Sequence, residues 1–188
     1  MLRREIRISG MGGQGVITLA YILGQACLFD GKYAAQTQSY GPEARGSICR
    51  SEVVIGDEPI DYPWIVQPDI LLAMSQDAYD QYHTDIKRDG CIIIDPILVK
   101  HVNPHPLITV YTIQATETAT NVVGSPIAAN VVMFGALTTI TRLITEEAAQ
   151  KSIVKRWPKY ANLNIKALHE GLALGGKALV NAGSSNPD

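Results

Sequence analysis

The sequence predicts an α/β fold, a three-layer sandwich built around a mainly parallel sheet and finishing in C-terminal helices. Short apolar runs bounded by turns alternate with helical segments over the first two thirds of the chain. A glycine-rich turn joins a strand to a helix near the start, and the last third has a helical pattern. With 188 residues, 46% hydrophobic and 18% charged, the chain is expected to form one domain over residues 1–182, followed by a flexible tail, residues 183–188.

The first elements follow from the spacing of apolar residues. Arg3 to Ser9 alternates charged and apolar residues, which is typical of a half-buried strand. Val16 to Phe29 carries its apolar residues at helical spacing, and Asp30-Gly31 ends that helix. A second strand is expected from Lys32 to Gln38. Ser47 to Ile55 alternates again and predicts a third strand.

The later elements complete a Rossmann-like arrangement. Asp69 to Met74 and Cys91 to Asp95 are short apolar runs flanked by turns, as expected of buried parallel strands, and Leu107 to Ile113 is a further strand candidate. A surface helix is expected after the fourth strand. The remaining helices are expected at about Ser125 to Leu143, Glu146 to Trp157 and Ile165 to Val180.

One long segment without charge, Thr118 to Thr141, raises the question of a membrane span. It contains asparagines, threonines and glycines, and Ser125-Pro126 has the residue types that begin a helix inside the segment. A buried helix is therefore expected. The net charge of −2 offers no electrostatic footprint for nucleic acid or an anionic membrane, and Met1 to Ile6 does not begin a signal peptide. A cytoplasmic protein is expected.

The glycine-rich turn has the spacing of a dinucleotide-binding motif. Gly10, Gly12 and Gly15 match G-x-G-x-x-G between a strand and a helix, where backbone N–H groups suit a phosphate or a carboxylate. A dinucleotide site also needs an acidic residue at the end of the second strand. Gln36 to Gln38 contains none, and Asp30 lies in the turn that ends the helix. A packing turn and an anion or interface loop therefore stay open, and a dinucleotide site is disfavoured.

A second unusual loop, "TQSYGPEARGS" at Thr37 to Ser47, links the second and third strands. It carries Tyr40, Glu43 and Arg45, and it is either a surface turn with a Glu43–Arg45 ion pair or a functional loop. Because ligands gather at the carboxyl ends of strands, this loop and the glycine turn are expected at the same sheet edge.

These two motifs together resemble the gamma subunit of 2-oxoacid:ferredoxin oxidoreductases. "TQSYGPEARG" is most similar to the 2-oxoglutarate branch of that family. Ser47 stands where the family usually has glycine, which affects only local loop geometry. The resemblance covers about Arg4 to Leu172. It rests on "GMGGQGV", "SYGPEARGS", "PDILLAMSQDAYD", "GCIIID" and "NVVMFGAL", in that order along the chain.

The resemblance implies a multi-subunit enzyme that oxidatively decarboxylates a 2-oxoacid to an acyl-coenzyme A. In the family, thiamine diphosphate with magnesium lies between alpha- and beta-type subunits, and [4Fe-4S] clusters in beta- and delta-type subunits pass electrons to ferredoxin or a similar acceptor. The gamma-type chain completes the assembly near the coenzyme A region. Two alternatives stay open: the same complex acting on pyruvate, branched-chain or aryl 2-oxoacids such as phenylglyoxylate, and a free-standing nucleotide-binding redox or regulatory module.

No catalytic or metal-binding residue is expected in this chain itself. A four-iron cluster needs about four grouped thiolates, whereas Cys27, Cys49 and Cys91 are widely spaced within predicted helices and strands. His101 and His105 are four residues apart, but the neighbouring prolines exclude a helix there. The acidic residues on the helix expected after the fourth strand are interpreted as a solvated face: Asp77, Asp80 and Asp85.

The candidate binding site therefore combines the two loops. We expect the backbone donors of the turn, with the Gln14 amide pointing out of it, to face the partner subunits together with the fixed cation of the second loop. This edge would help hold the coenzyme A phosphates or the active-site entrance. Its expected residues are Gly12, Gly13, Gln14, Gly15, Tyr40 and Arg45.

Overall fold

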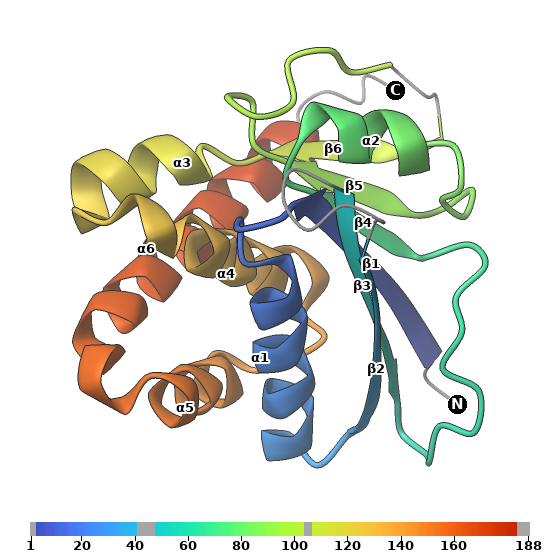
Figure 1. The fold of residues 1–188 in the computed structure, drawn as a ribbon, viewed down its shortest axis with the longest axis horizontal. Helices are drawn as coiled ribbons and strands as arrows, with labels where there is room; N and C mark the ends of the chain where they lie inside the picture. Colours follow the sequence, from blue (N-terminus) through green and yellow to red (C-terminus); the bar gives the residue numbers. More distant parts are fainter. Residues whose placement is uncertain (1–2, 41–47, 104–106, 184–188) are drawn as a thin grey trace.

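The computed structural model describes residues 3–40, 48–103 and 107–183 (Figure 1). The strands are β1 (Arg3–Met11), β2 (Tyr33–Tyr40), β3 (Ile48–Gly56), β4 (Ile70–Ala73), β5 (Cys91–Ile94) and β6 (Thr109–Thr112). The helices are α1 (Val16–Phe29), α2 (Gln76–Tyr82), α3 (Ala115–Thr118), α4 (Ala129–Thr141), α5 (Glu146–Arg156) and α6 (Ala161–Gly183). A π turn (Ala119–Val123) and two 3-10 turns (Pro126–Ala128 and Pro158–Tyr160) lie between the later helices.

The six strands form one sheet in the order β2-β3-β1-β4-β5-β6. β1, β4, β5 and β6 pair in parallel, whereas β3 is antiparallel to both β1 and β2. β3 inserts between β1 and β2, so β2 again runs in the direction of β1. The predicted mainly parallel sheet is confirmed, with β3 reversed.

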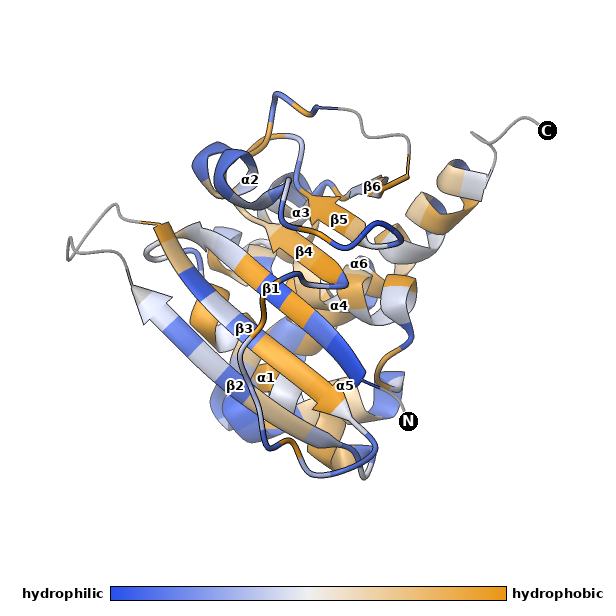
Figure 2. Cartoon of the chain, turned by 90° about the vertical axis from the view of Figure 1, so that its right-hand side faces the viewer, coloured by the Kyte–Doolittle hydropathy of each residue, from blue (hydrophilic) through white to orange (hydrophobic). Residues whose placement is uncertain are grey.

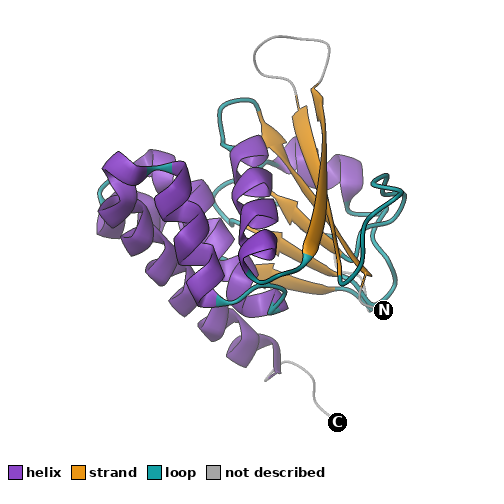
Figure 3. Ribbon diagram, turned by 90° about the horizontal axis from the view of Figure 1, so that it is seen from below, coloured by secondary structure: helices purple, strands orange, loops and turns teal. Residues whose placement is uncertain are grey.

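The two faces of the sheet are covered unequally (Figure 3). Helices α1, α4, α5 and α6 lie on one face, and α2 lies on the other together with long connecting segments. The larger apolar core lies beneath the four helices and draws residues from β1 through α6. A smaller core lies beneath α2 and includes Leu71, Tyr79 and Ile92. The three expected layers are present, and the glycine turn belongs to the heavily covered side.

The uncharged segment of the sequence folds as several pieces. Residues 115–123 form α3 and the π turn, and α4 follows a 3-10 turn. Every residue from Asn130 to Thr138 is buried, which confirms the predicted buried helix. None of the helices in the described ranges is long and apolar enough to cross a bilayer. The helical segment begins as predicted, with Ser125 at the N-cap position and Pro126 first in a 3-10 turn, although Ser125 makes no side-chain cap. The α-helix itself begins four residues after Ser125, at Ala129.

Helices α4 and α6 pack with their backbones in contact. Gly171 of α6 lies directly against the backbone of Val132 in α4, and Gly135 of α4 lies against the backbone of Leu168. A Cβ atom at Gly175 would lie 2.9 Å from the carbonyl oxygen of the facing α4 backbone. This close approach fixes α6 on the core.

The ends of α6 and α2 differ from the sequence-based expectations. α6 begins at Ala161, four residues earlier than expected from the apolar pattern. Asp85 lies beyond the end of α2, so its predicted place on that helix is wrong; its half-exposed carboxylate contacts the Arg7 guanidinium at 3.1 Å. The single domain over residues 1–182 stays a prediction, and residues 184–188 of the expected tail lie outside the described residues.

Candidate functional site

The glycine turn leaves β1 and enters α1 through a self-closed loop. Gln14 N–H donates to the Met11 carbonyl (3.2 Å), and Met11 N–H donates to Gln14 Oε1 (2.6 Å). The amide oxygen of Gln14 therefore faces into the turn and stabilises it. The expectation that the Gln14 amide points out of the turn is wrong for this oxygen, because Oε1 accepts the hydrogen bond of the Met11 N–H and closes the loop on itself.

The glycines of the turn serve two different needs. At Gly10 a Cβ atom would lie 2.9 Å from the Met74 Cβ atom and 3.1 Å from a methyl group of Val16, so glycine allows β1, β4 and α1 to meet. At Gly13 no atom crowds the position, but its φ of +98° favours glycine. Gly15 combines a φ of +80° with close contact to the Asn130 side chain of α4. The packing interpretation thus accounts for part of the motif.

The start of α1 is electropositive. Its N-cap residue, Gly15, has no side chain to accept a hydrogen bond, and the first turn of the helix contains no acidic residue. The first N–H groups and the positive end of the helix dipole are therefore uncompensated by the helix itself.

A cavity of about 510 Å³ opens beside this helix end. The cavity is lined by the turn at Gly13 to Gly15 and by Asn130 of α4. Arg156 and Tyr160, which come much later in the sequence, complete the lining. The Arg156 guanidinium lies 5.3 Å from the centre of the Trp157 ring and forms no ion pair with any residue in the described ranges. The cavity therefore joins an uncapped helix N-terminus to an arginine cation, an arrangement suited to an anionic group.

The strand order brings the second loop to the same edge. Cys49 of β3 pairs with Gly10 of β1 on one side and with Tyr40 of β2 on the other. Tyr40 thus ends β2 level with the glycine turn, two strand spacings or roughly 10 Å away. The shared edge is confirmed at Tyr40, whereas Arg45 lies outside the described residues.

The same strand order argues against a dinucleotide site. In the dinucleotide-binding arrangement the second strand lies next to the first, so that its terminal acid reaches the ribose. Here β3 separates β2 from β1, and the Gln36 amide donates to the Ser51 hydroxyl at 2.9 Å within the sheet. As the sequence indicated, the end of β2 has no acidic residue. Even if it had one, this strand order would hold that residue too far from the turn.

Comparison with known proteins identifies the family. The sequence model of the pyruvate ferredoxin/flavodoxin oxidoreductase family matches residues 5–174. This chain belongs to that family. It is 50% identical over 160 residues to the 2-oxoglutarate synthase subunit KorC of Methanocaldococcus jannaschii, covering 84% of this chain and 86% of that protein. It is 32% identical over 167 residues to the pyruvate synthase subunit PorC of Methanothermobacter marburgensis, covering 87% of this chain and 92% of that protein.

A solved structure of the family has the same fold. The gamma subunit of a keto/oxoacid ferredoxin oxidoreductase from Geobacter sulfurreducens superposes with a TM-score of 0.87 at 40% identity, covering 95% of this chain and 99% of that one. The resemblance to the gamma subunit stated from the two loop motifs is confirmed, and so is the α/β fold class. This chain is a gamma-type member of the oxidoreductase family.

The cysteines of this family member lie on three different elements, Cys27 and Cys49 buried and Cys91 partly buried. Cys27 lies in α1, Cys49 in β3 and Cys91 in β5, and burial raises the pKa of Cys27 to about 12 and of Cys91 to about 11. Such thiols keep their proton at neutral pH in the folded chain. Within the described residues, no three His, Cys, Asp or Glu side chains gather as a metal site would require; His105 lies outside them.

Sequence reasoning missed Arg156 as a component of the site. It ends α5 about 140 residues after the turn, and basic residues in the last turn of a helix are common for electrostatic reasons alone. No spacing signal links it to the glycines. Only the packing of α5 and α6 against α1 and α4 brings it to the cavity.

Proposed function

We propose that this chain is the gamma-type subunit of a 2-oxoglutarate:ferredoxin oxidoreductase. The complex would oxidatively decarboxylate 2-oxoglutarate to its acyl-coenzyme A and pass the electrons to ferredoxin. Its higher identity with the subunit of 2-oxoglutarate synthase than with that of pyruvate synthase supports this substrate, and this difference carries the proposal. The chain would act in the cytoplasm with alpha-, beta- and delta-type subunits.

The redox cofactors of such a complex belong to its other subunits. The three cysteines of this chain lie on three separate elements, α1, β3 and β5, which does not fit the four grouped thiolates of a [4Fe-4S] cluster. Thiamine diphosphate supplies the carbanion chemistry where it binds, with magnesium, and no residue of this chain is assigned to it. The gamma-type chain is therefore proposed to contribute binding and assembly, without a catalytic residue of its own.

We propose that the sheet edge at the glycine turn faces the partner subunits and helps hold the phosphates of coenzyme A or the active-site entrance. The residues proposed for this role are Gly12, Gly13, Gln14, Gly15, Tyr40 and Arg45. The free N-terminus of α1 and the nearby Arg156 support a role in binding an anion, because both place positive charge beside the turn. Coenzyme A, when bound, supplies the thiol that accepts the acyl group.

The native complex tests this function directly. We expect the chain to co-purify with larger subunits and an iron–sulfur absorbance, and the complex to show its highest kcat/KM with 2-oxoglutarate in a panel of 2-oxoacids. A preference for pyruvate, a branched-chain or an aryl 2-oxoacid would contradict the proposed substrate and leave the proposed subunit role standing. A colourless monomer that binds NAD would overturn both and support the nucleotide-binding module.

A further inference from the structure

A long connection crosses the sheet face opposite α1. Residues 57–69, which we name the strap, join β3 to β4 and run back over β3 and β1 (Figure 2). Beneath it lie the side chains of Arg7, 2% exposed, and Glu52, 4% exposed, in a buried ion pair of 2.8 Å. The strap therefore takes the place of a helix on this part of the sheet.

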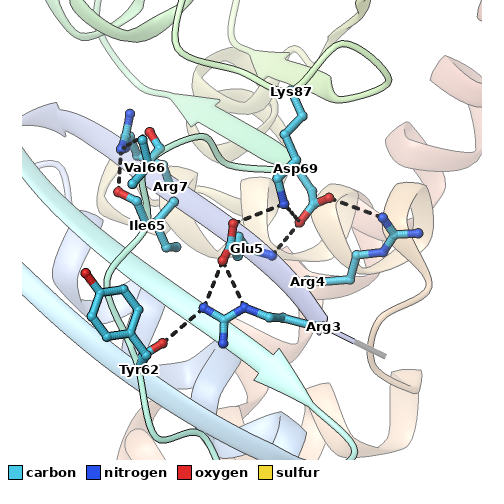
Figure 4. A network of polar contacts seen from close by, with 9 residues as sticks. All are labelled: Arg3, Arg4, Glu5, Arg7, Tyr62, Ile65, Val66, Asp69 and Lys87. Carbon is cyan, nitrogen blue, oxygen red and sulfur yellow. Dashed lines mark hydrogen bonds and ion pairs between the residues drawn. The ribbon is translucent and has the colours of Figure 1, made fainter. Parts of the chain in front are cut away.

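Arginines of β1 hold the strap by its backbone (Figure 4). The Arg3 guanidinium donates to the Tyr62 carbonyl at 3.0 Å, and Arg7 Nη2 donates to the Ile65 carbonyl at 3.3 Å and the Val66 carbonyl at 3.5 Å. At the end of the strap, Asp69 accepts from the Glu5 N–H at 2.8 Å. The path of the strap is thus fixed from below by groups of one rigid strand.

Three of the exposed side chains of this fixed backbone are large and apolar. Tyr62 is 63% exposed, Trp64 60% and Val66 79%, whereas Ile65 between them is buried. These three exposed side chains lie within five consecutive residues of the strap, and we call them the apolar row. Large apolar side chains held in a row on a preorganised backbone are typical of binding surfaces, in which tryptophan and tyrosine often contribute most of the affinity.

The strap also carries negative charge without a partner. Glu58 and Asp61 line a hollow of about 290 Å³ beside Tyr62, and neither forms an ion pair or hydrogen bond with any residue that the structure describes. Arg3 also lines the hollow, but its guanidinium already pairs with Glu5 at 2.8 Å and donates to the Tyr62 carbonyl at 3.0 Å. A lysine or arginine side chain fits this hollow, where it would meet both carboxylates and an aromatic ring.

We propose that the strap is a docking surface for another subunit of the oxidoreductase complex, one that presents an apolar patch flanked by lysine or arginine. The inference rests on the proposed function, because the occupant is a subunit of the same complex. It adds a second contact on the sheet face opposite α1, separate from the edge at the glycine turn. A second copy of this chain fits less well, because a symmetric contact would bring the unpaired carboxylates of two straps together.

Assembly of the complex from its subunits tests the apolar row. We expect Trp64→Ser and Val66→Ser together to raise the Kd for assembly about tenfold or more, as loss of a central aromatic anchor does. Leu28→Ser is the matched control, because Leu28 is 56% exposed on α1, away from the strap, and its Kd should equal that of the wild type. Circular dichroism and the Tm of each free variant verify the fold. An unchanged Kd for the double variant, with the wild type assembling normally, overturns the inference and leaves the proposed function standing.

Charge and proximity distinguish the possible occupants. Glu58→Gln with Asp61→Asn should slow association several-fold at low salt, and the difference should vanish near ~1 M salt, where charges are screened.

A photo-crosslinking residue in place of Trp64 should attach to a larger subunit of the purified complex. Crosslinking to a second copy of this chain overturns the inference. If the wild-type chain joins no other subunit at all, the proposed function fails and the inference fails with it.

Discussion

At the scale of single residues, the candidate site depends on charges that meet across long stretches of chain. Arg156 reaches the glycine turn from the end of α5, and no ion pair within the described residues neutralises it. Arg7, by contrast, is fully engaged by Glu52, Asp85 and two strap carbonyls. The first arginine is available to bind a ligand, and the second serves to hold structure.

This difference leads to a prediction on coenzyme A affinity. In the assembled enzyme, Arg45→Ala and Arg156→Ala should each raise the KM for coenzyme A by about tenfold, the loss expected for one charge-assisted contact with a phosphate. Lys151→Ala is the control, because Lys151 is an exposed residue of α5 paired with Glu147. Steady-state kinetics with varied coenzyme A measure the effect. An unchanged KM in a normally assembled complex would reduce the glycine-turn edge to a structural role.

At the scale of elements, α4 and α6 form the contact that most restricts substitution. A Cβ atom at Gly171 would press on the backbone of Val132 and come within 3.0 Å of the Gly135 Cα atom. Backbone atoms cannot move aside as a flexible side chain can. The two helices must therefore separate to admit even one methyl group.

We predict that Gly171→Ala lowers the free energy of unfolding by about 1–3 kcal/mol, the usual cost of overpacking. Gly176→Ala is the matched control in the same helix, since no atom packed against the helix lies within 4 Å of the point that a Cβ atom would occupy there. This control should raise the free energy of unfolding by up to about 1 kcal/mol through helix propensity. Urea denaturation of the free chain measures both. Equal stability of the two variants would contradict the backbone contact.

Local elements were predictable from the sequence, and their order in the sheet was not. α1 spans the predicted residues because its apolar stripe and its Asp30-Gly31 end are both local signals. The insertion of β3 between β1 and β2 depends on which strand edges pair, and alternation within Ser47 to Ile55 contains no information about the neighbours. The same holds for the candidate site. The glycine turn was predictable from its motif, whereas Arg156 reaches the turn only through the packing of helices.

At the scale of the whole molecule, the shifted pKa values of the thiols and phenols share one direction. Burial raises the pKa of Cys27, Cys49 and Cys91. Burial also raises the pKa of the Tyr79 and Tyr111 hydroxyls. Each of these groups keeps its proton more tightly in the folded chain than in the unfolded chain. Their contribution to stability is therefore complete below the unfolded pKa and is lost as the pH rises toward the folded value.

The free chain should consequently lose stability at alkaline pH. For Cys27 the window runs from the ordinary thiol pKa of 9.0 to about 12, and within it the free energy of unfolding should fall by up to about 1.4 kcal/mol per pH unit for this one group. Urea denaturation between the two values, compared with Cys27→Ala, measures this contribution. The variant starts from a lower stability because it leaves a small cavity, but its stability should decline less steeply with pH, since one fewer thiol ionises on unfolding. Parallel slopes for the two proteins would show that Cys27 is ionised alike in the folded and unfolded chains, contrary to its complete burial in α1.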